Sequence, residues 1–194
     1  PQITWIDLDG GSVRSVEVAG GAVVGLNAKR GDPEAFIGLS SVTSPTHSYL
    51  IAATSAAVTS LAGLVQPAAD AFEVPQTVTE RRTAISKDGT PVPYFLIASA
   101  DADRSQPQPS LLYGYGGFKI PVLADYRPGW PCWLAAGGLL AIANLRGGGE
   151  FGTAWYEAGR LGRKWNTFND FVDVTNYLVA RGYGARDRVF AAGG

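Results

Sequence analysis

The sequence predicts antiparallel β-strands in the first part of the chain and a parallel α/β sheet with flanking helices in the second. Two patterns support this fold class. Up to about residue 70, short segments alternate apolar and polar residues between turns, as half-buried strands do. After residue 110, continuous apolar runs flank one long amphipathic helix, which is typical of strands buried on both faces. We therefore expect two domains, at 1–70 and 71–194.

Short strands fill the first domain. The segments with strand patterns are 3–8, 12–18, 23–28, 34–42, 49–54 and 58–65. Asp9, Gly10 and Gly11 supply turn residues for a hairpin between the first two. Strands at this spacing are typical of a β-sandwich or of β-propeller blades, and the chain is too short to show a repeat of blades. The segment 66–75 contains prolines and several alanines, and it is the predicted linker.

The second domain begins with a strand pair joined by an Asp-Gly turn and continues with alternating strands and helices. We expect strands at 77–85, 91–98, 111–113, 139–144 and 189–192, and helices at 130–136 and 167–181. The longer helix has apolar residues at helical spacing, with Asn166 or Thr167 as its cap and Gly182 at its end. We interpret Asp170 and Asp173 as a capping residue and part of a solvated face.

Three glycine-rich segments follow predicted parallel strands, at 113–118, 146–152 and 189–194. Open α/β sheets bind ligands at this edge. In the first segment, the glycines either form a tight turn or bring the backbone and the Tyr115 hydroxyl close to a reacting group, with Phe118 lining an apolar pocket. The second lacks the spacing of phosphate-binding motifs, so we expect no nucleotide there. Its Arg146 and Glu150 are interpreted as a local pair.

The third segment ends in Gly193 and Gly194. A buried strand that runs into Gly-Gly is compatible with the first half of a nucleophile elbow, G-x-S-x-G. Gly193 would be the first glycine of that motif and Gly194 the variable residue, and the serine would come next. His47 is the chain's only histidine, and we interpret it as a surface or satisfied strand residue. The chain therefore contains no complete Ser-His-Asp set.

The composition argues against several classes of function. The 194 residues carry 16 basic and 17 acidic side chains, and a net charge of −1 gives no reason to expect a nucleic acid or an anionic membrane as partner. With one cysteine and one histidine, we expect no internal disulfide, no metal site and no cofactor. No apolar run reaches the roughly 18–20 residues of a membrane-spanning helix. The chain lacks methionine and starts within a strand pattern, so we interpret it as an internal fragment.

Taken together, four segments resemble the prolyl oligopeptidase family of serine peptidases in order and spacing. They read LLYGYGGF at 111–118, NLRGGGEFG at 144–152, KWNTFNDF at 164–171 and VFAAGG at 189–194. The segment 32–54 is similar to the closing part of the family's β-propeller. The resemblance implies the N-terminal half of an α/β-hydrolase domain at 71–194, preceded at 1–70 by the C-terminal part of a β-propeller.

The same resemblance implies hydrolysis of short peptides after proline through an acyl-enzyme. It makes Tyr115 a donor to the oxyanion and places Phe118 in the proline-binding pocket. It places Arg146 and Glu150 in the loop scaffold near the site, and the two final glycines at the start of the nucleophile elbow. In the family, the serine, aspartate and histidine of the triad all lie beyond this point. We therefore expect the 194 residues alone to be inactive.

Two alternatives stay open at the level of sequence. The segment 166–171 is slightly closer to the branch that cleaves after basic residues, so an oligopeptidase B or acyl-peptidase relative is one alternative. A non-catalytic remnant or binding module is the other. For the whole protein we expect short proline-containing peptides as partners, a monomer, and a cytoplasmic or periplasmic location. We expect the isolated fragment to fold poorly, because cut sheets expose strand edges and apolar faces.

Overall fold

A computed structural model describes residues 2–6, 11, 13–17, 21–52, 55, 57–62 and 74–193. The chain divides into two compact units, residues 1–73 with 124–128 and residues 74–123 with 129–194. Most of the predicted linker at 66–75 lies outside the described residues, as do Asp9 and Gly10 of the predicted hairpin turn. Within the described ranges, no helix has both the length and the apolar content needed to cross a membrane.

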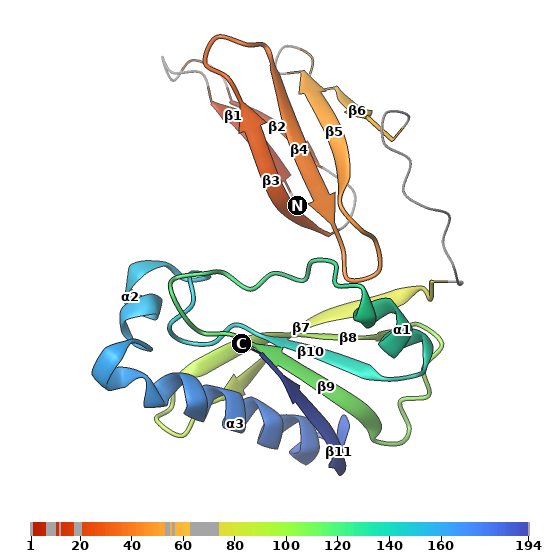
Figure 1. Ribbon diagram of the computed structural model, residues 1–194, viewed down its shortest axis with the longest axis vertical. Helices are drawn as coiled ribbons and strands as arrows, with labels where there is room; N and C mark the ends of the chain where they lie inside the picture. The colour runs from red at the N-terminus through yellow and green to blue at the C-terminus, as the bar shows by residue number, and fades with distance from the viewer. Residues whose placement is uncertain are drawn as a thin grey trace. The chain divides into compact units, whose positions relative to one another are not determined.

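The first unit is antiparallel β, as the alternating pattern predicts (Figure 1). β1 (Gln2–Ile6) pairs with β2 (Val13–Glu17). A four-stranded sheet follows in the order β3-β4-β5-β6. Its strands are Ala22–Ala28, Glu34–Ser40, His47–Ala52 and Val58–Ser60. Neighbouring strands in this sheet are antiparallel throughout, so short connections suffice to join them.

Alternation along β4 separates the two faces of this sheet. Ile37 and Leu39 are buried together with Ile51 of β5, and Trp5 of β1 packs against them. Phe36, between the buried positions of β4, is about half exposed. This is the period of two that a strand with one buried face must have. The core of the first unit therefore lies on one face of its sheet.

The second unit contains a five-stranded sheet in the order β11-β9-β10-β8-β7. Its strands are β7 (Thr77–Ile85), β8 (Pro91–Ser99), β9 (Gln108–Gly114), β10 (Leu139–Ala143) and β11 (Gly184–Ala192). β9 lies between β10 and β11 and is parallel to both. β8 is antiparallel to β10 and to β7. The predicted parallel arrangement of the last three strands is confirmed, and an antiparallel pair extends the sheet at one edge.

Helices cover both faces of this sheet. α3 (Trp165–Ala180) runs along one face (Figure 1) and buries Leu178 against the strands. α1 (Gly129–Ala135) packs on the other face, where Trp130 meets Tyr113 edge to face with ring centroids 5.8 Å apart. All five residues of β10 are buried, because both faces of this strand are covered. The continuous apolar run at 139–143 reflects this burial on both faces of the strand.

The connection between β10 and α3 differs from the prediction. It contains α2 (Gly152–Glu157) and a 3-10 turn, η1 (Leu161–Arg163), which no periodic pattern in the sequence indicates. α3 begins at Trp165 and has no side-chain cap. Thr167 is therefore not a capping residue; it is buried in the first turn. Gly182 ends the helix as predicted, with a φ of 70° that favours glycine.

Candidate functional site

The three glycine-rich segments meet at one edge of the second sheet. Leu112 of β9 lies opposite Ala141 of β10 and Ala191 of β11, so the three parallel strands end at the same level. A cavity of about 390 Å³ opens where their loops meet. It is lined by Gly114, Tyr115, Gly117, Phe118, Leu145, Lys164, Thr167, Phe168, Phe171 and Gly193. Tyr115, Phe118 and Gly193, three of the candidate site residues from the sequence, therefore share one cavity.

Glycine is required in these loops because backbones touch there. A Cβ on Gly114 would come within 2.7 Å of the Leu145 Cδ1 atom, and a Cβ on Gly193 would collide with the Gly114 carbonyl oxygen. Gly116 adds a φ of 62°, in the left-handed region that glycine adopts without strain. The end of β11 therefore lies directly against the loop that carries Tyr115.

Tyr115 and Phe118 stack on each other, with ring centroids 6.4 Å apart and ring planes at 28°. Phe118 and Lys119 have φ values of 53° and 58°, which are unfavourable for residues with a Cβ. The Phe118 residue is 82% exposed. In the part of the chain that the structure describes, the Tyr115 hydroxyl has no hydrogen-bond partner. It is therefore free to donate to a group bound in the cavity.

The start of α3 reaches back to these loops through two side chains. Lys164 Nζ donates to the Gly116 carbonyl at 2.5 Å. The Thr167 hydroxyl oxygen lies 2.6 Å from the Arg146 carbonyl oxygen, 3.2 Å from that of Gly159 and 3.4 Å from that of Gly116. Burial lowers the pKa of Lys164, because its charged form loses hydration. Sequence patterns do not identify these contacts, since they join segments far apart along the chain.

Arg146 is buried, and its partners are not the one predicted. Its guanidinium forms a bidentate pair with Asp170 of α3, with Nε 2.9 Å from Oδ2 and Nη2 2.5 Å from Oδ1. Nη1 donates to Asp88, in the turn between β7 and β8, at 2.5 Å. Hydrogen bonds to Asp170 and then to Asp88 raise the pKa of Arg146, and Arg146 lowers the pKa of Asp88 to about 2. The predicted local pair with Glu150 does not form.

Glu150 instead ties a different segment to the loop. Its Oε1 accepts hydrogen bonds from the Val122 amide at 2.9 Å and from Asn144 Nδ2 at 3.4 Å. Its Oε2 is buried without a hydrogen-bond partner among the described residues. Burial raises the pKa of Glu150, because the carboxylate loses hydration. Arg146 and Glu150 both hold loops together, and neither is among the residues that line the cavity.

The two aspartates of α3 are not a cap and a solvated face, so that prediction is wrong. Asp170 is fully buried and also accepts from the Arg146 amide at 3.1 Å. Asp173 accepts from the Ser86 hydroxyl at 3.1 Å and from the Lys87 amide at 2.8 Å. Helical periodicity tells which residues share a face. Periodicity does not show which residues from distant segments pack against that face, such as Arg146 and Ser86 here.

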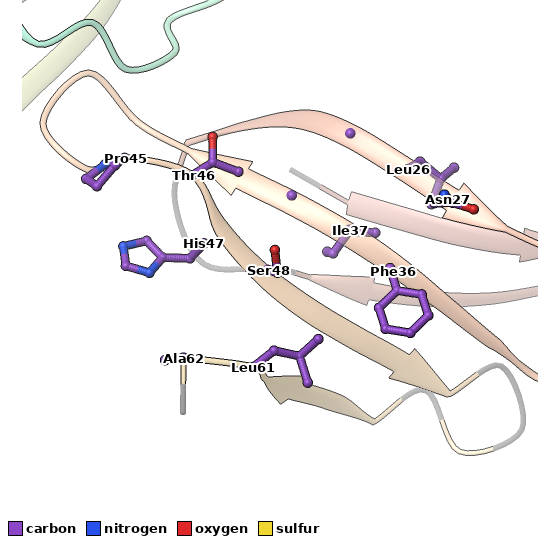
Figure 2. Close-up of a pocket in the computed structure, with 12 residues that line it drawn as sticks. Leu26, Asn27, Phe36, Ile37, Pro45, Thr46, His47, Ser48, Leu61 and Ala62 are labelled. Carbon is purple, nitrogen blue, oxygen red and sulfur yellow. The ribbon is translucent and has the colours of Figure 1, made fainter. Parts of the chain in front are cut away.

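A second hollow, of about 630 Å³, lies on the sheet of the first unit (Figure 2). Leu26, Phe36 and Leu61 are among its lining side chains. His47 lies in its wall, with Nε2 3.1 Å from the Ser44 hydroxyl oxygen. This is the satisfied strand histidine that the sequence predicts. Among the described residues that line this hollow, His47 is the only one with an ionisable side chain, so the hollow offers no acid–base pair.

The cavity of the second unit holds part of what acyl transfer needs. Tyr115 can donate to an oxyanion, and Phe118 offers an apolar face. The only histidine of the 194 residues belongs to the first unit, so the second unit contains no imidazole base. Gly194, the predicted variable residue of the elbow, lies outside the described residues. The described residues that line the cavity therefore include the Tyr115 hydroxyl and the Phe118 ring but no imidazole base.

Comparison with known proteins points to one family. The family model described as the prolyl oligopeptidase family matches residues 127–194. Dipeptidyl aminopeptidase BI of Pseudoxanthomonas mexicana is 41% identical over 132 residues, which cover 68% of this chain and 18% of the relative. Prolyl endopeptidase of Elizabethkingia miricola is 28% identical over 193 residues, which cover 99% of this chain and 27% of the relative. The chain thus spans less than a third of the length of either protein.

Solved structures agree with these relatives. One prolyl endopeptidase structure superposes with a TM-score of 0.85 and 36% identity, covering 99% of this chain and 28% of the other. Oligopeptidase B from Leishmania major superposes with a TM-score of 0.81 and 27% identity, covering 98% of this chain and 28% of the other. These matches confirm the expected architecture, in which part of an α/β-hydrolase domain follows strands from the end of a β-propeller. On sequence and fold together, residues 127–194 match the prolyl oligopeptidase family, and the chain over 99% of its length has the fold of a solved prolyl endopeptidase.

Proposed function

We propose that this chain is a segment of a serine peptidase that hydrolyses short peptides after proline through an acyl-enzyme intermediate. The observation that carries the proposal is the cavity shared by Tyr115, Phe118 and Gly193. Gly193 lies against the Gly114 carbonyl, beside Tyr115, so a nucleophile that follows Gly194 would enter the same cavity. In this proposal, the serine, aspartate and histidine of the triad come from the rest of the protein.

In the proposed mechanism, the serine attacks the scissile carbonyl and the carbonyl oxygen becomes an oxyanion. The Tyr115 hydroxyl donates a hydrogen bond to that oxyanion, and the amide after the serine supplies a second donor. Loss of one such donor lowers kcat by about 10²–10³, which is about 2.7–4 kcal/mol. Tyr115→Phe should therefore lower kcat by this factor with little change in KM, because the donor acts mainly in the transition state. An unchanged kcat would remove Tyr115 from the mechanism.

Phe118 is the residue that we propose selects proline. A flat, largely exposed ring offers an apolar face to a pyrrolidine ring. The matched proteins differ in name, since they include a dipeptidyl aminopeptidase and an oligopeptidase B beside prolyl endopeptidases. The alternative to cleavage after proline is therefore that the protein has the specificity of an oligopeptidase B or of an acyl-peptidase. Hydrolysis of a reporter panel with proline, arginine and acyl-amino-acid groups distinguishes these specificities.

For the whole protein we further propose short proline-containing peptides as substrates, a monomeric state, and a cytoplasmic or periplasmic location. A related proposal is that the 194 residues alone are inactive, because the triad comes from the rest of the protein, and fold poorly, because cut sheets expose strand edges and apolar faces. A non-catalytic binding module is the candidate from a different class. The two differ in one readout, because a fluorophosphonate probe labels the whole protein only if it has an activated serine.

The deciding experiment is to sequence the coding DNA beyond the Gly194 codon. The peptidase proposal expects a serine codon next, then x-Gly-Gly, and later an aspartate and a histidine in that order. A stop codon or a different residue at that position would leave Tyr115 and Phe118 without a nucleophile. The non-catalytic function would then replace the proposed one.

A further inference from the structure

We propose that Lys164, which holds the Gly116 carbonyl, and Thr167, whose hydroxyl contacts the carbonyls of three loops, are positioning residues that fix the loop from which Tyr115 and Phe118 enter the cavity. The inference rests on the proposed peptidase function. It assigns a role to two side chains that line the same cavity. Neither side chain is assigned a chemical step; each acts through the loop that it holds.

Carbonyl oxygens from three loops converge at the start of α3. They belong to Gly116 after β9, Arg146 after β10 and Gly159 after α2, and all lie within 3.4 Å of the Thr167 hydroxyl oxygen. One hydroxyl has one hydrogen to donate, so it cannot satisfy three acceptors. The shortest of the three contacts, 2.6 Å, is to Arg146. The Gly116 carbonyl receives its donor from Lys164 Nζ instead, at 2.5 Å.

The loop that these contacts hold is strained. Gly116, Phe118 and Lys119 all have positive φ, and two of the three carry a Cβ. Such a conformation persists only where surrounding contacts over-determine it. A Cβ on Gly116 would collide with the Thr167 Cγ2 atom, so the Thr167 methyl packs closely against the loop. Removing either side chain should let the loop relax and move the Tyr115 hydroxyl.

The environment of Lys164 supports a positioning role rather than an ion pair. Among the described residues no carboxylate forms a salt bridge with it. Its Nζ also lies 5.8 Å from the centroid of the Phe168 ring. Holding a partly buried ammonium without a counter-charge is unfavourable unless its donors are used. Here the carbonyl dipole of Gly116 uses one of them.

The test uses the full-length protein that contains this chain. Lys164→Met removes the ammonium and keeps an apolar stem, and Thr167→Val removes the hydroxyl and keeps the shape. We expect each to lower kcat on a Gly-Pro amide reporter by about tenfold or more, with KM changed less than about twofold, because a small displacement of a transition-state donor has this effect. Thr167→Ser keeps the hydroxyl and should retain most of kcat. Arg163→Met is the matched control, since Arg163 is exposed and precedes Lys164, and it should leave kcat unchanged.

A double-mutant cycle with Tyr115→Phe separates positioning from general damage. If Lys164 acts through the Tyr115 hydroxyl, Lys164→Met should have almost no further effect in the Tyr115→Phe background. An equal loss of kcat in both backgrounds, or a kcat unchanged by Lys164→Met, would overturn the inference and leave the proposed function intact. If Tyr115→Phe itself leaves kcat unchanged, the oxyanion role fails and the inference fails with it. If Lys164→Met does not fold, the same cycle is run with Thr167→Val, and Thr167→Ser serves as its control.

Discussion

Asp170→Asn is the change with the largest expected effect on stability. Asp170 is fully buried, and it accepts from both the guanidinium and the amide of Arg146. Asparagine keeps the size of the side chain, but it removes the charge and turns one acceptor into a donor that faces the N–H groups of Arg146. Removing one partner of a buried ion pair costs about 3–5 kcal/mol, because the other charge stays buried. Asp88, whose side chain is 41% exposed, still contacts Arg146 and should reduce this cost.

We therefore expect Asp170→Asn to lower the free energy of unfolding by about 2–4 kcal/mol. Urea unfolding of the full-length protein, followed by tryptophan fluorescence, measures this. Trp155 is a local reporter, because its Nε1 donates to the Leu145 carbonyl at 2.9 Å, next to Arg146. Asp173→Asn is the matched control on the same helix and should cost about 1 kcal/mol, since it loses ordinary hydrogen bonds. The reasoning is refuted if Asp170→Asn costs no more than Asp173→Asn.

Three further predictions concern single positions. Phe118→Ala should lower kcat/KM for a proline reporter by about tenfold or more. The unfolding midpoint should stay unchanged, because Phe118 is 82% exposed. An equal loss of kcat/KM for an arginine reporter would contradict the proposal that Phe118 selects proline. Gly193→Ala should reduce thermal stability, because its Cβ would collide with the Gly114 carbonyl oxygen, and an unchanged midpoint would count against that packing. Burial raises the pKa of Glu150 above 4.5, so the contribution of Glu150 to stability should fall as the pH rises through the raised pKa. Urea midpoints measured between pH 4 and 8 should therefore fall less in Glu150→Gln than in the unchanged protein.

Most of the fold follows from local patterns in the sequence. The strand at Thr77–Ile85 coincides with its predicted bounds, β10 ends one residue earlier than predicted, and α3 starts two residues and ends one residue earlier. Alternation and apolar runs record burial directly, which is why these elements are predictable. α2 and the turn η1 are not, because they are too short to show a period and contain no buried residue. Packing from other segments fixes them instead.

The candidate site is predictable only in part. Tyr115, Phe118 and Gly193 stand beside glycines at strand ends, and that local signal suffices to place them at one edge of the sheet. The partners of Arg146 could not be derived in the same way. Asp170 lies 24 residues after Arg146 in the chain, and Asp88 lies 58 residues before Arg146. A nearby opposite charge such as Glu150 is the natural guess from sequence, and tertiary packing selects other partners.

One face of the start of α3 explains why the glycine loops keep their shape. Lys164, Thr167 and Asp170 follow each other at intervals of three residues, so they point to the same side of the helix. Lys164 binds the loop after β9, Thr167 contacts three loops, and Asp170 holds the side chain and amide of Arg146 after β10. Glycines let the loops approach each other, but flexible loops alone would not hold a catalytic geometry. The polar face of α3 supplies that restraint, and its residues are therefore expected to be as important for the proposed activity as the glycines themselves.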